Sequence, residues 1–440
     1  MNKIQKEKKL IFVELNEINF DVVKSYISKG EVLPAFSKIF REELIITKSE
    51  SEYENLEPWI QWPSVHTGLS YKDHKIFRLG DCVNSDKKQY FEKIEAAGYK
   101  VGAVSPMNAS NKLLKPSYFI PDPWTQTETD GSFFSKGISK AVSQAVNDNS
   151  SSKLNISTIF HLGLAFIFLV NPLKMPSLIK YALSAISNPW RKALFLDKLL
   201  HEIHKTLYRR KKPNFSTLFL NAGAHIQHHY YFNSPFVESA ELQNPDWYIK
   251  ESKDPFLEML IVYDEILLDI FKLNNSSIII ATGLSQTPYS CLKFYYRLKN
   301  HKKFLDLLGI KYNEVIPRMT RDFLISFNTE TDAAIAEKAL KEIYVDNQVK
   351  LFEEIDNRGS ELFVVLTYPH EVKDSSTINV NDEIVKLHNF VVFVAIKNGE
   401  HQGKGFAYFS DGIKEFAPKS SSHVSAIHYS VLDYFNADHI

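Results

Sequence analysis

The stretch Leu10–Asn16, LIFVELN, is an apolar run that contains one acidic residue, Glu14, and ends at a polar Asn. A continuous apolar run of this length is typical of a parallel strand that is buried on both faces. Phe20, Val23 and Ile27 then follow with helical spacing, and Gly30 stands where such a helix would stop. The start of the chain therefore predicts a strand followed by a helix.

The same alternation continues along the chain. Further strands are predicted over 44–47, 100–104, 216–220, 277–282 and 390–396, and further helices over 90–97, 255–273 and 424–435. Strands that alternate with helices favour βαβ units and a parallel sheet covered by helices. We therefore expect an α/β fold with a central, mostly parallel sheet.

Two stretches depart from this alternation. Residues 126–153 are rich in Ser, Thr, Asn, Asp and Gly, which predicts a loop, and 154–212 are helical and end in the basic run RRKK. Residues 317–368 give a strand, a helix and two strands, including KLFEEID as one strand. The predicted division is a core of 1–125, 213–316 and 388–440, a loop and helical insert or cap at 126–212, and a small α+β lobe at 317–387.

Composition restricts the function. The 52 basic and 52 acidic side chains cancel, so no net field attracts nucleic acid, and no nucleic-acid partner is expected. The chain has only two cysteines, which excludes a disulfide framework and argues against a zinc site built from cysteines. The apolar run after the basic N-terminus is too short for a signal peptide, so a cytoplasmic location is expected.

One segment raises the question of a membrane. Residues 159–170 are almost wholly apolar, with His161 inside the run and Asn171–Pro172 at its end. A membrane-spanning helix needs about 20 apolar residues, so a buried or interfacial helix is the better prediction. The insert at 154–212 is interpreted as a helical cap over the site, with peripheral membrane contact as the alternative.

Histidines mark three segments that follow predicted strands. His66 lies in WPSVHTG, three histidines lie in NAGAHIQHHYY, and His401 lies in a Gly-rich segment, NGEHQGKG, predicted to be a loop. Ligands of open α/β sheets bind at the carboxyl ends of strands. His225 and His229 are four residues apart, so a helical turn would place both on one face, as a metal site requires. An aromatic, histidine-rich wall without a metal is the other interpretation.

The order of these elements and their motifs resembles the alkaline phosphatase superfamily, in particular its phosphodiesterase and nucleotide pyrophosphatase branch. Thr67–Gly68 matches the family's TG pair, and His74 matches the His of its HG pair. His225 matches the His of the Asp-xxx-His motif, and His401 matches the last metal-binding His. The resemblance covers about 1–125, 213–290 and 388–440, and it implies phosphoryl transfer with two zinc ions and a hydroxyl nucleophile.

The departures from the family pattern are equally specific. Asn16 stands in place of the first metal-binding Asp, Asn221 in place of the Asp of Asp-xxx-His, and Gln61 at the nucleophile position. Gly283 and Leu284 replace the next Asp and His. A carboxamide has no hydroxyl to activate, so the resemblance implies that the covalent route is absent. One metal site is expected to be abolished and the other half kept.

These observations give a set of candidate residues. The metal ligands are predicted to be His225, His229 and His401, which would hold one divalent ion, zinc or manganese. The catalytic candidates are Gln61 and three carboxylates that could act as general bases, Glu14, Glu17 and Glu57. The substrate-binding candidates are Asn16, His66, Asn221, His228 and Gln286, with Arg318 and Arg321 as an anion clamp.

Two classes of function follow. The first is a divergent hydrolase or transferase that acts on a phosphate ester, a nucleotide-sugar or a glycan-linked phosphate with one metal or none. The second is a catalytically silent binding or scaffold protein. The amides at the predicted strand ends favour a remodelled polar pocket that binds a neutral or anionic ligand without a metal; they are Asn16, Gln61, Asn221, Gln227 and Gln286.

Overall fold

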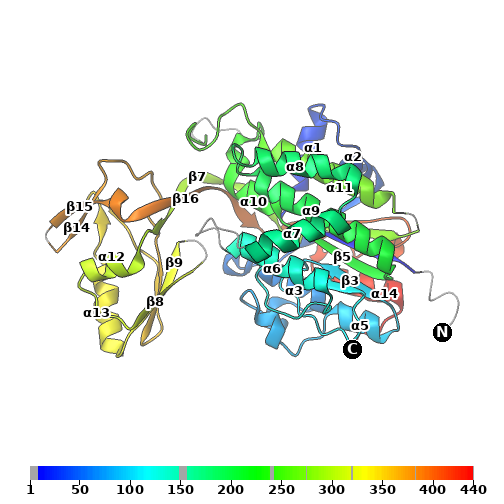
Figure 1. Ribbon diagram of the computed structural model, residues 1–440, viewed down its shortest axis with the longest axis horizontal. Coiled ribbons are helices and arrows are strands. Elements are labelled where there is room, and N and C mark those ends of the chain that lie inside the picture. Colours follow the sequence, from blue (N-terminus) through cyan, green and yellow to red (C-terminus); the bar gives the residue numbers. More distant parts are fainter. Residues whose placement is uncertain are drawn as a thin grey trace. The chain divides into compact units, whose positions relative to one another are not determined.

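The computed structural model describes residues 8–147, 156–237, 242–273, 275–318, 321–381 and 383–439 (Figure 1). The chain forms two compact units. The first comprises the chain up to Phe236, Ser252–Pro288 and the chain from Gly399 onward. The second comprises Val237–Glu251 and Tyr289–Asn398. The predicted small lobe at 317–387 lies inside the second unit, which begins earlier than predicted, whereas the predicted insert at 126–212 belongs to the first.

An eight-stranded sheet forms the centre of the first unit. Its strands, from edge to edge, are β18 (Ser422–His423), β2 (Leu44–Lys48), β17 (Lys404–Phe409), β6 (Ser277–Ala281), β1 (Leu10–Leu15), β5 (Phe215–Leu220), β3 (Val101–Val104) and β4 (Tyr118–Ile120). Only β17 runs antiparallel to its neighbours, β2 and β6; the other pairs are parallel. The predicted α/β fold with a mostly parallel sheet is confirmed.

Strand β1 lies near the middle of this sheet, and every one of its residues is buried. Leu15 pairs with Leu220 of β5, and Glu14 pairs with Ala281 of β6. The carboxyl ends of these three parallel strands therefore lie side by side. The segments that follow them are brought to one edge of the sheet, where ligands of such folds bind.

Helices cover both faces of the sheet (Figure 1). One group consists of α2 (Pro34–Glu42), α9 (Arg191–Lys211), α10 (Ala222–Tyr230) and α11 (Pro255–Phe271), with α1 (Phe20–Ser28) packed on α2. The other consists of α3 (Pro58–Thr67), α5 (Tyr90–Ala96) and α14 (Ala426–Phe435). The second group buries an aromatic core in which Phe12 of β1 packs with Trp62 and Tyr90.

Part of the stretch predicted as a loop is helical. Helix α6 (Phe133–Asn147) occupies it, with Ile138, Ala141 and Val142 buried at helical spacing. The Ser and Gly content of the segment concealed this apolar stripe; residues 148–153 of the predicted loop lie outside the described residues. Helices α7 (Ile156–Leu169) and α8 (Met175–Ser184) follow as expected from the helical pattern.

The second unit contains two four-stranded antiparallel sheets. One is β12 (Ile355–Asn357), β13 (Glu361–Val365), β9 (Asp322–Ser326) and β8 (Glu314–Pro317); the other is β11 (Val349–Lys350), β10 (Tyr344–Val345), β14 (Thr377–Val380) and β15 (Glu383–Lys386). Helices α12 (His301–Leu307) and α13 (Glu330–Lys341) accompany them. The stretch KLFEEID is therefore not one strand, because its two ends belong to different sheets.

Two of the four passages of the chain between the units lie within long strands, β7 (Ser285–Leu298) and β16 (Val391–Gln402), which pair with each other. The predicted Gly-rich loop NGEHQGKG is wrong, since β16 runs to Gln402 and β17 begins at Lys404. A Cβ on Gly405 would lie 2.6 Å from Thr47 Oγ1. The glycine therefore serves close strand packing instead of a turn.

In the part of the chain that the structure describes, no helix combines the length and apolarity that crossing a membrane requires. The apolar helix α7 has 14 residues.

Candidate active site

The site is built around Glu17, which follows β1. The Asn16 amide donates to the Leu220 carbonyl at 3.1 Å, and the Glu17 amide donates to the Thr282 carbonyl at 3.1 Å, so this turn is anchored between the ends of β5 and β6. Glu17 has a φ of 64°, a left-handed conformation that is uncommon for residues with a side chain. Its carboxylate is nonetheless buried, with the residue 2% exposed. Surrounding structure must hold such a residue in place.

Helix α10 is held close to this turn. The Ala222 amide at its first position donates to Asp197 Oδ2 at 2.7 Å, and burial raises the pKa of Asp197 to about 6. A Cβ on Gly223 would lie 2.0 Å from Ile18 Cδ1, so only glycine permits this approach. One turn later, Gln227 Nε2 donates to the Glu17 carbonyl at 2.8 Å. The next residue, His228, is thereby placed beside the Glu17 side chain.

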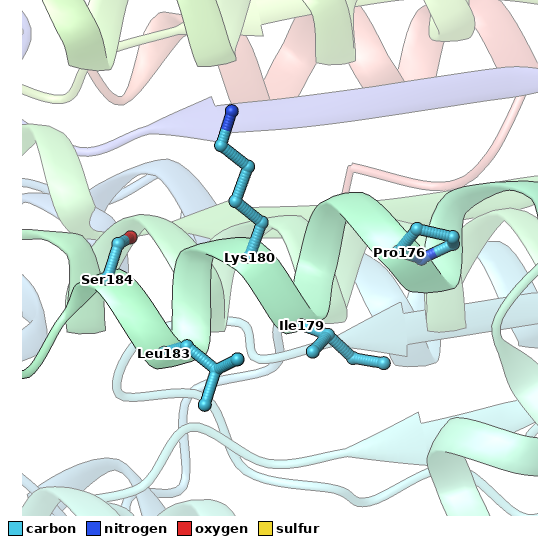
Figure 2. Close-up of a pocket in the computed structure, with 5 residues that line it drawn as sticks. All are labelled: Pro176, Ile179, Lys180, Leu183 and Ser184. Carbon is cyan, nitrogen blue, oxygen red and sulfur yellow. The ribbon is translucent and has the colours of Figure 1, made fainter.

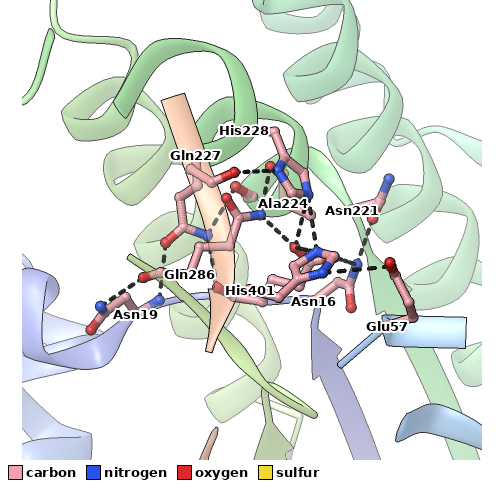
Figure 3. A network of polar contacts seen from close by, with 12 residues as sticks. Asn16, Asn19, Glu57, Asn221, Ala224, Gln227, His228, Gln286 and His401 are labelled. Atoms are coloured by element: carbon pink, nitrogen blue, oxygen red, sulfur yellow. Dashed lines mark hydrogen bonds and ion pairs between the residues drawn. The ribbon is translucent and has the colours of Figure 1, made fainter. Parts of the chain in front are cut away.

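Strand β16 supplies the third member, His401. His401 Nε2 lies 3.0 Å from Glu17 Oε2, His228 Nε2 lies 3.2 Å from the same oxygen, and the two ring nitrogens are 3.2 Å apart (Figure 3). The three atoms form a nearly equilateral triangle. They come from the turn after β1, from helix α10 and from the end of β16. The fold and not the local sequence therefore brings them together.

The far side of each imidazole is also bonded. His228 Nδ1 lies 3.0 Å from the Gly399 carbonyl, which only accepts, so Nδ1 donates and the lone pair of the neutral ring is on Nε2. His401 Nδ1 lies 3.5 Å from Glu57 Oε2, which orients that ring in the same sense. Histidines that bind metals characteristically donate their other N–H to a carbonyl or a carboxylate. Without a metal, an Nε2 proton joins each ring to Glu17. A metal ion would replace these protons, so that an oxygen of Glu17 and both Nε2 lone pairs would face one point.

Amides orient the Glu17 carboxylate (Figure 3). Asn16 Nδ2 donates to Glu17 Oε1 at 3.0 Å and to Asn221 Oδ1 at 2.9 Å, and Trp62 Nε1 donates to Asn16 Oδ1 at 2.8 Å. Gln286 Nε2 donates to Glu17 Oε2 and, at 3.1 Å, to the Ala224 carbonyl. Of the amides predicted at strand ends, Asn16 and Gln286 therefore hold the Glu17 carboxylate directly, and Asn221 holds Asn16.

Gly399 connects these two sets of contacts. Its carbonyl accepts from His228, and a Cβ on it would lie 2.2 Å from Gln286 Oε1 and 2.7 Å from the Gln227 carbonyl oxygen. The backbone of β16 can approach Gln286 this closely only because position 399 has no side chain. The same residue therefore orients His228 and leaves room for the amide that holds Glu17.

The charge of Glu17 is set by its histidines. Burial alone would raise its pKa, but the electrostatic influence and hydrogen bonds of His401 and His228 hold the pKa of this carboxyl well below its usual range. Glu17 is therefore an anion at neutral pH. An anionic oxygen beside two imidazole nitrogens is the donor set that zinc and similar divalent ions prefer.

The spacing fits one metal ion. Ligands about 2.0–2.1 Å from a tetrahedral zinc lie about 3.3 Å from one another, and the three atoms here are 3.0–3.2 Å apart. They match one face of a tetrahedron and leave the fourth position for water or substrate. The residues present therefore fit a single divalent ion.

The sequence-based ligand set differs from this geometry. It shares only His401 with the triangle; the rings of His225 and His229 contact each other at an interplanar angle of 60°, with centroids 4.8 Å apart. His228, predicted to bind substrate, and Glu17, predicted to be catalytic, complete the structural set. Within α10, the face toward Glu17 is fixed by Gly223 and Gln227, which the His225–His229 spacing did not reveal.

Glu57 and Gln61 have different environments. Glu57 is the N-cap residue of α3, next to His401, and its side chain is 30% exposed. Gln61 lies one turn inside α3, where its Nε2 donates to the Asn55 carbonyl at 2.8 Å and its Oε1 accepts from the Glu50 amide at 3.4 Å. The start of α3 thus presents Glu57 to the site, and the helix dipole favours a carboxylate there.

The remaining candidates lie elsewhere. Glu14 is buried with Tyr90 and His66 in the aromatic core: Tyr90 Oη is 3.4 Å and His66 Nε2 is 3.7 Å from Glu14 Oε1. Arg318 and Arg321 belong to the second unit, where Arg321 stacks on Tyr295 with its guanidinium 3.9 Å from the ring centre. Their role as an anion clamp stays a prediction.

A second group of ligand-type side chains lies between α9 and α11. It consists of His201, Glu202 and Asp269. Lys205 Nζ contacts Glu202 Oε1 at 2.5 Å and Asp269 Oδ2 at 2.9 Å. This group therefore already contains a cation.

No family model and no curated protein matches the sequence. Among solved structures, the chain is similar to phosphonoacetate hydrolase from Sinorhizobium meliloti 1021 in complex with phosphonoformate, with 12% identity, coverage of 97% of this chain and 96% of that chain, and a TM-score of 0.43. It is similar to murine ectonucleotide pyrophosphatase/phosphodiesterase 5 at 11% identity, with 98% and 96% coverage and a TM-score of 0.41.

It is also similar to the alkaline phosphatase of the Antarctic bacterium TAB5, at 11% identity, with 98% coverage of both chains and a TM-score of 0.41. These likenesses, at 11–12% identity and with TM-scores of 0.41–0.43, carry no argument about this chain. The roles of individual residues in this chain rest on the geometry described above.

Proposed function

We propose that this chain hydrolyses phosphate esters with a single divalent ion, zinc or manganese, held by Glu17, His228 and His401. The observation that carries the proposal is the triangle of ligand atoms, 3.0–3.2 Å on each side. Its members are oriented from behind by the Gly399 carbonyl, Glu57 and the amides of Asn16 and Gln286. Such outer contacts set ligand direction and basicity in metal sites.

A divalent ion at this point would polarise a phosphoryl oxygen and stabilise the charge that develops on it. The rest of the chemistry belongs to side chains of this chain. Glu17 and the two histidines bind and orient, and the partly exposed Glu57 accepts a proton from water as the water oxygen attacks phosphorus. The ester P–O bond then breaks, and the departing oxygen takes a proton from solvent.

Attack by water is supported by the positions of the hydroxyl groups in α3. Ser64 Oγ contacts the Ile60 carbonyl at 3.3 Å and His74 Nε2 at 3.0 Å, and Thr67 Oγ1 donates to the Pro63 carbonyl at 2.7 Å. Both are buried within the helix packing. Gln61 has no hydroxyl, so we infer a direct displacement without a covalent intermediate.

The choice of phosphate esters rests on the sequence resemblance at Thr67–Gly68, His225 and His401 and on the position of the site at the carboxyl ends of β1, β5 and β6. Nucleotide-sugars and glycan-linked phosphates belong to the same chemical class. Which of these esters is the substrate is a matter for direct assay.

Metal analysis tests the proposal. We expect the purified full-length protein, dialysed after exposure to zinc or manganese, to retain about one equivalent of metal and to hydrolyse an aryl phosphodiester. Because His228 is a ligand, His228→Ala should lose the metal and the activity. Because His229 is the neighbouring residue outside the triangle, His229→Ala is the matched control and should retain both.

Two outcomes would contradict the proposal. Metal loss in His229→Ala but not in His228→Ala would restore the ligand set predicted from sequence. If the protein shows neither bound metal nor hydrolysis, the site is not a metal hydrolase, and a binding or scaffold role on this fold becomes the better account.

A further inference from the structure

The insert helices of the first unit differ in charge from the rest of the chain. Between Gly131 and Leu196 the sequence has one acidic residue, Asp148, whereas the whole chain has equal numbers of acidic and basic side chains. The basic residues of this stretch are Lys136, Lys140, Lys153, Lys174, Lys180, Arg191 and Lys192. The described residues in this range, 131–147 and 156–196, include no acidic side chain. The stretch is thus strongly cationic within a neutral protein.

The same helices expose large apolar side chains. Leu173, in the short 3₁₀ turn η5 (Pro172–Lys174) between α7 and α8, is 87% exposed, and Ile186, just after α8, is 84% exposed. Ile179 and Leu183, four residues apart on α8, are exposed as well, and Ile186 follows Leu183 by three residues. On α7, Ile167 and Phe168 are exposed near its C-terminus. Isolated exposed apolar residues are ordinary, but a run of this kind is not.

Helix α8 has an open outer surface. Pro176, Ile179, Lys180, Leu183 and Ser184 line a shallow apolar hollow along it (Figure 2). Helices α7 and α8 both pack against α9, which in turn packs against β3 and β5 of the central sheet. Helices α7 and α8 therefore form an additional layer outside the core helices.

Basic side chains lie beside these apolar residues. Lys174 and Lys180 are exposed at and next to the α8 positions. The exposed run Arg209–Lys212 is joined to α7, since Arg210 Nη2 donates to the Phe168 carbonyl at 2.9 Å. Arg191 is paired with Glu258 and does not add to this charge.

We propose that the surface formed by α7, η5 and α8 binds an anionic lipid bilayer, with Ile179, Leu183 and Ile186 entering the headgroup region. Helices that lie in a membrane interface combine an exposed apolar face with flanking Lys and Arg. Basic side chains near an anionic bilayer each contribute about fivefold in partitioning. The charge of the surface decides against a second copy of this chain, because two such surfaces would bring like charges together.

Vesicle sedimentation of the full-length protein tests this inference. We expect binding to vesicles in which about a third of the lipid is anionic phosphatidylglycerol, weaker binding to pure phosphatidylcholine, and weakening by salt. The triple variant Ile179→Ser, Leu183→Ser, Ile186→Ser should lose at least about tenfold in binding. Lys174→Glu with Lys180→Glu should reduce binding to the anionic vesicles only.

Matched controls separate this effect from misfolding. Ile335 and Ile384 are exposed apolar residues of the second unit, so Ile335→Ser with Ile384→Ser should leave vesicle binding unchanged. Far-ultraviolet circular dichroism and metal content should be the same in all variants, because the substituted side chains are exposed and lie outside the Glu17 site.

Three results would overturn the inference. The first is no binding of the unaltered protein to anionic vesicles. The second is equal binding of the triple variant. The third is a dimer that the triple variant converts to a monomer while neither form binds vesicles, which would assign the surface to a second copy of the chain.

Discussion

Two groups of carboxylates and histidines in the first unit have similar compositions but opposite organisation. In the group of Asp269, Glu202 and His201, the ammonium of Lys205 is the cation, and the pKa of Asp269 is lowered by His201, 3.6 Å away, and by Lys205. In the group of Glu17, His228 and His401, the two histidines lower the pKa of the carboxyl.

The difference shows how a fold separates a structural ion cluster from a functional one. A lysine placed one turn after His201 completes the first group, so a metal ion would have to displace it. In the second group, the Gly399 carbonyl accepts from His228, and the amides of Asn16 and Gln286 donate to Glu17, so that the three ligand atoms face one point. Ligand-type residues alone do not distinguish the two; the orientation of their hydrogen bonds does.

The largest effect is expected for Glu57→Gln. Glutamine keeps the size of the side chain but cannot accept a proton, so kcat at saturating metal should fall about 10²- to 10⁴-fold. Metal affinity should fall about 10- to 100-fold, because the carboxylate behind His401 is lost. Steady-state kinetics and a chelator competition titration measure the two effects.

An unchanged kcat in Glu57→Gln would remove Glu57 as the proton acceptor and leave it only an orienting role. Lys302→Gln, an exposed substitution in the second unit, controls for differences between protein preparations and should leave kcat unchanged.

Lys205→Met should destabilise the fold without affecting the metal site. The ammonium is 5% exposed, and its removal leaves Glu202 and Asp269 without their cation. Removal of one partner of a buried ion pair costs about 3–5 kcal/mol in the free energy of unfolding. Urea denaturation measures this cost. A loss of bound metal in a folded Lys205→Met protein would mean that the second group, and not the Glu17 group, is the metal site.

Acid should weaken the fold through histidines buried next to the lysine cluster. Burial lowers the pKa of His204 to about 3, against an ordinary value of 6.5. The folded protein therefore keeps this ring neutral between those values, whereas the unfolded chain takes up a proton, so stability is present above pH 6.5 and is lost as pH falls toward 3. Each such group contributes a slope of about 1.4 kcal/mol per pH unit.

His204→Gln should remove about one proton from this slope, because an amide can bond to Ser216 without titrating. Urea denaturation at a series of pH values between these limits measures it. If the slope is the same in the variant, His204 is not buried as a neutral ring.

The smallest effect on activity is expected for Gln61→Ala. Its amide bonds to the backbone at Asn55 and Glu50, so the substitution should cost about 1–3 kcal/mol in unfolding free energy. Hydrolysis should stay within about twofold of the unaltered protein. A loss of activity comparable to that of Glu57→Gln would place Gln61 in the reaction after all.

The sequence predicts the core of the fold because its strands are marked by continuous apolar runs. Leu10–Leu15, Phe215–Leu220 and Ser277–Ala281 are such runs, and all three pair as predicted for a parallel sheet. Helix α6 was missed because its polar composition outweighs a stripe of three buried residues. The strands at 398–405, which are the end of β16 and the start of β17, were missed because glycine there serves close packing and not a turn.

The sequence identified most residues of the site but not how they are arranged. Glu17, Glu57, Asn16, Asn221, Gln286, His228 and His401 were all singled out, yet the face of α10 that meets Glu17 depends on the contact between Gly223 and Ile18, which are distant in sequence. Asp197 was missed although one signal was present: it is one of two acidic residues of α9 and lies among the leucines of the helix. Its partner, the start of α10, is set by tertiary structure.

Gly399 shows what this arrangement means for inherited change. It has no side chain and no reactive group, yet any side chain there would meet both the Gln286 amide and the Gln227 backbone. A single amino-acid substitution at this position would disturb Glu17 and His228 together while every ligand residue stayed intact. Evolution can therefore inactivate the site through Gly399, although Gly399 is not one of the ligands.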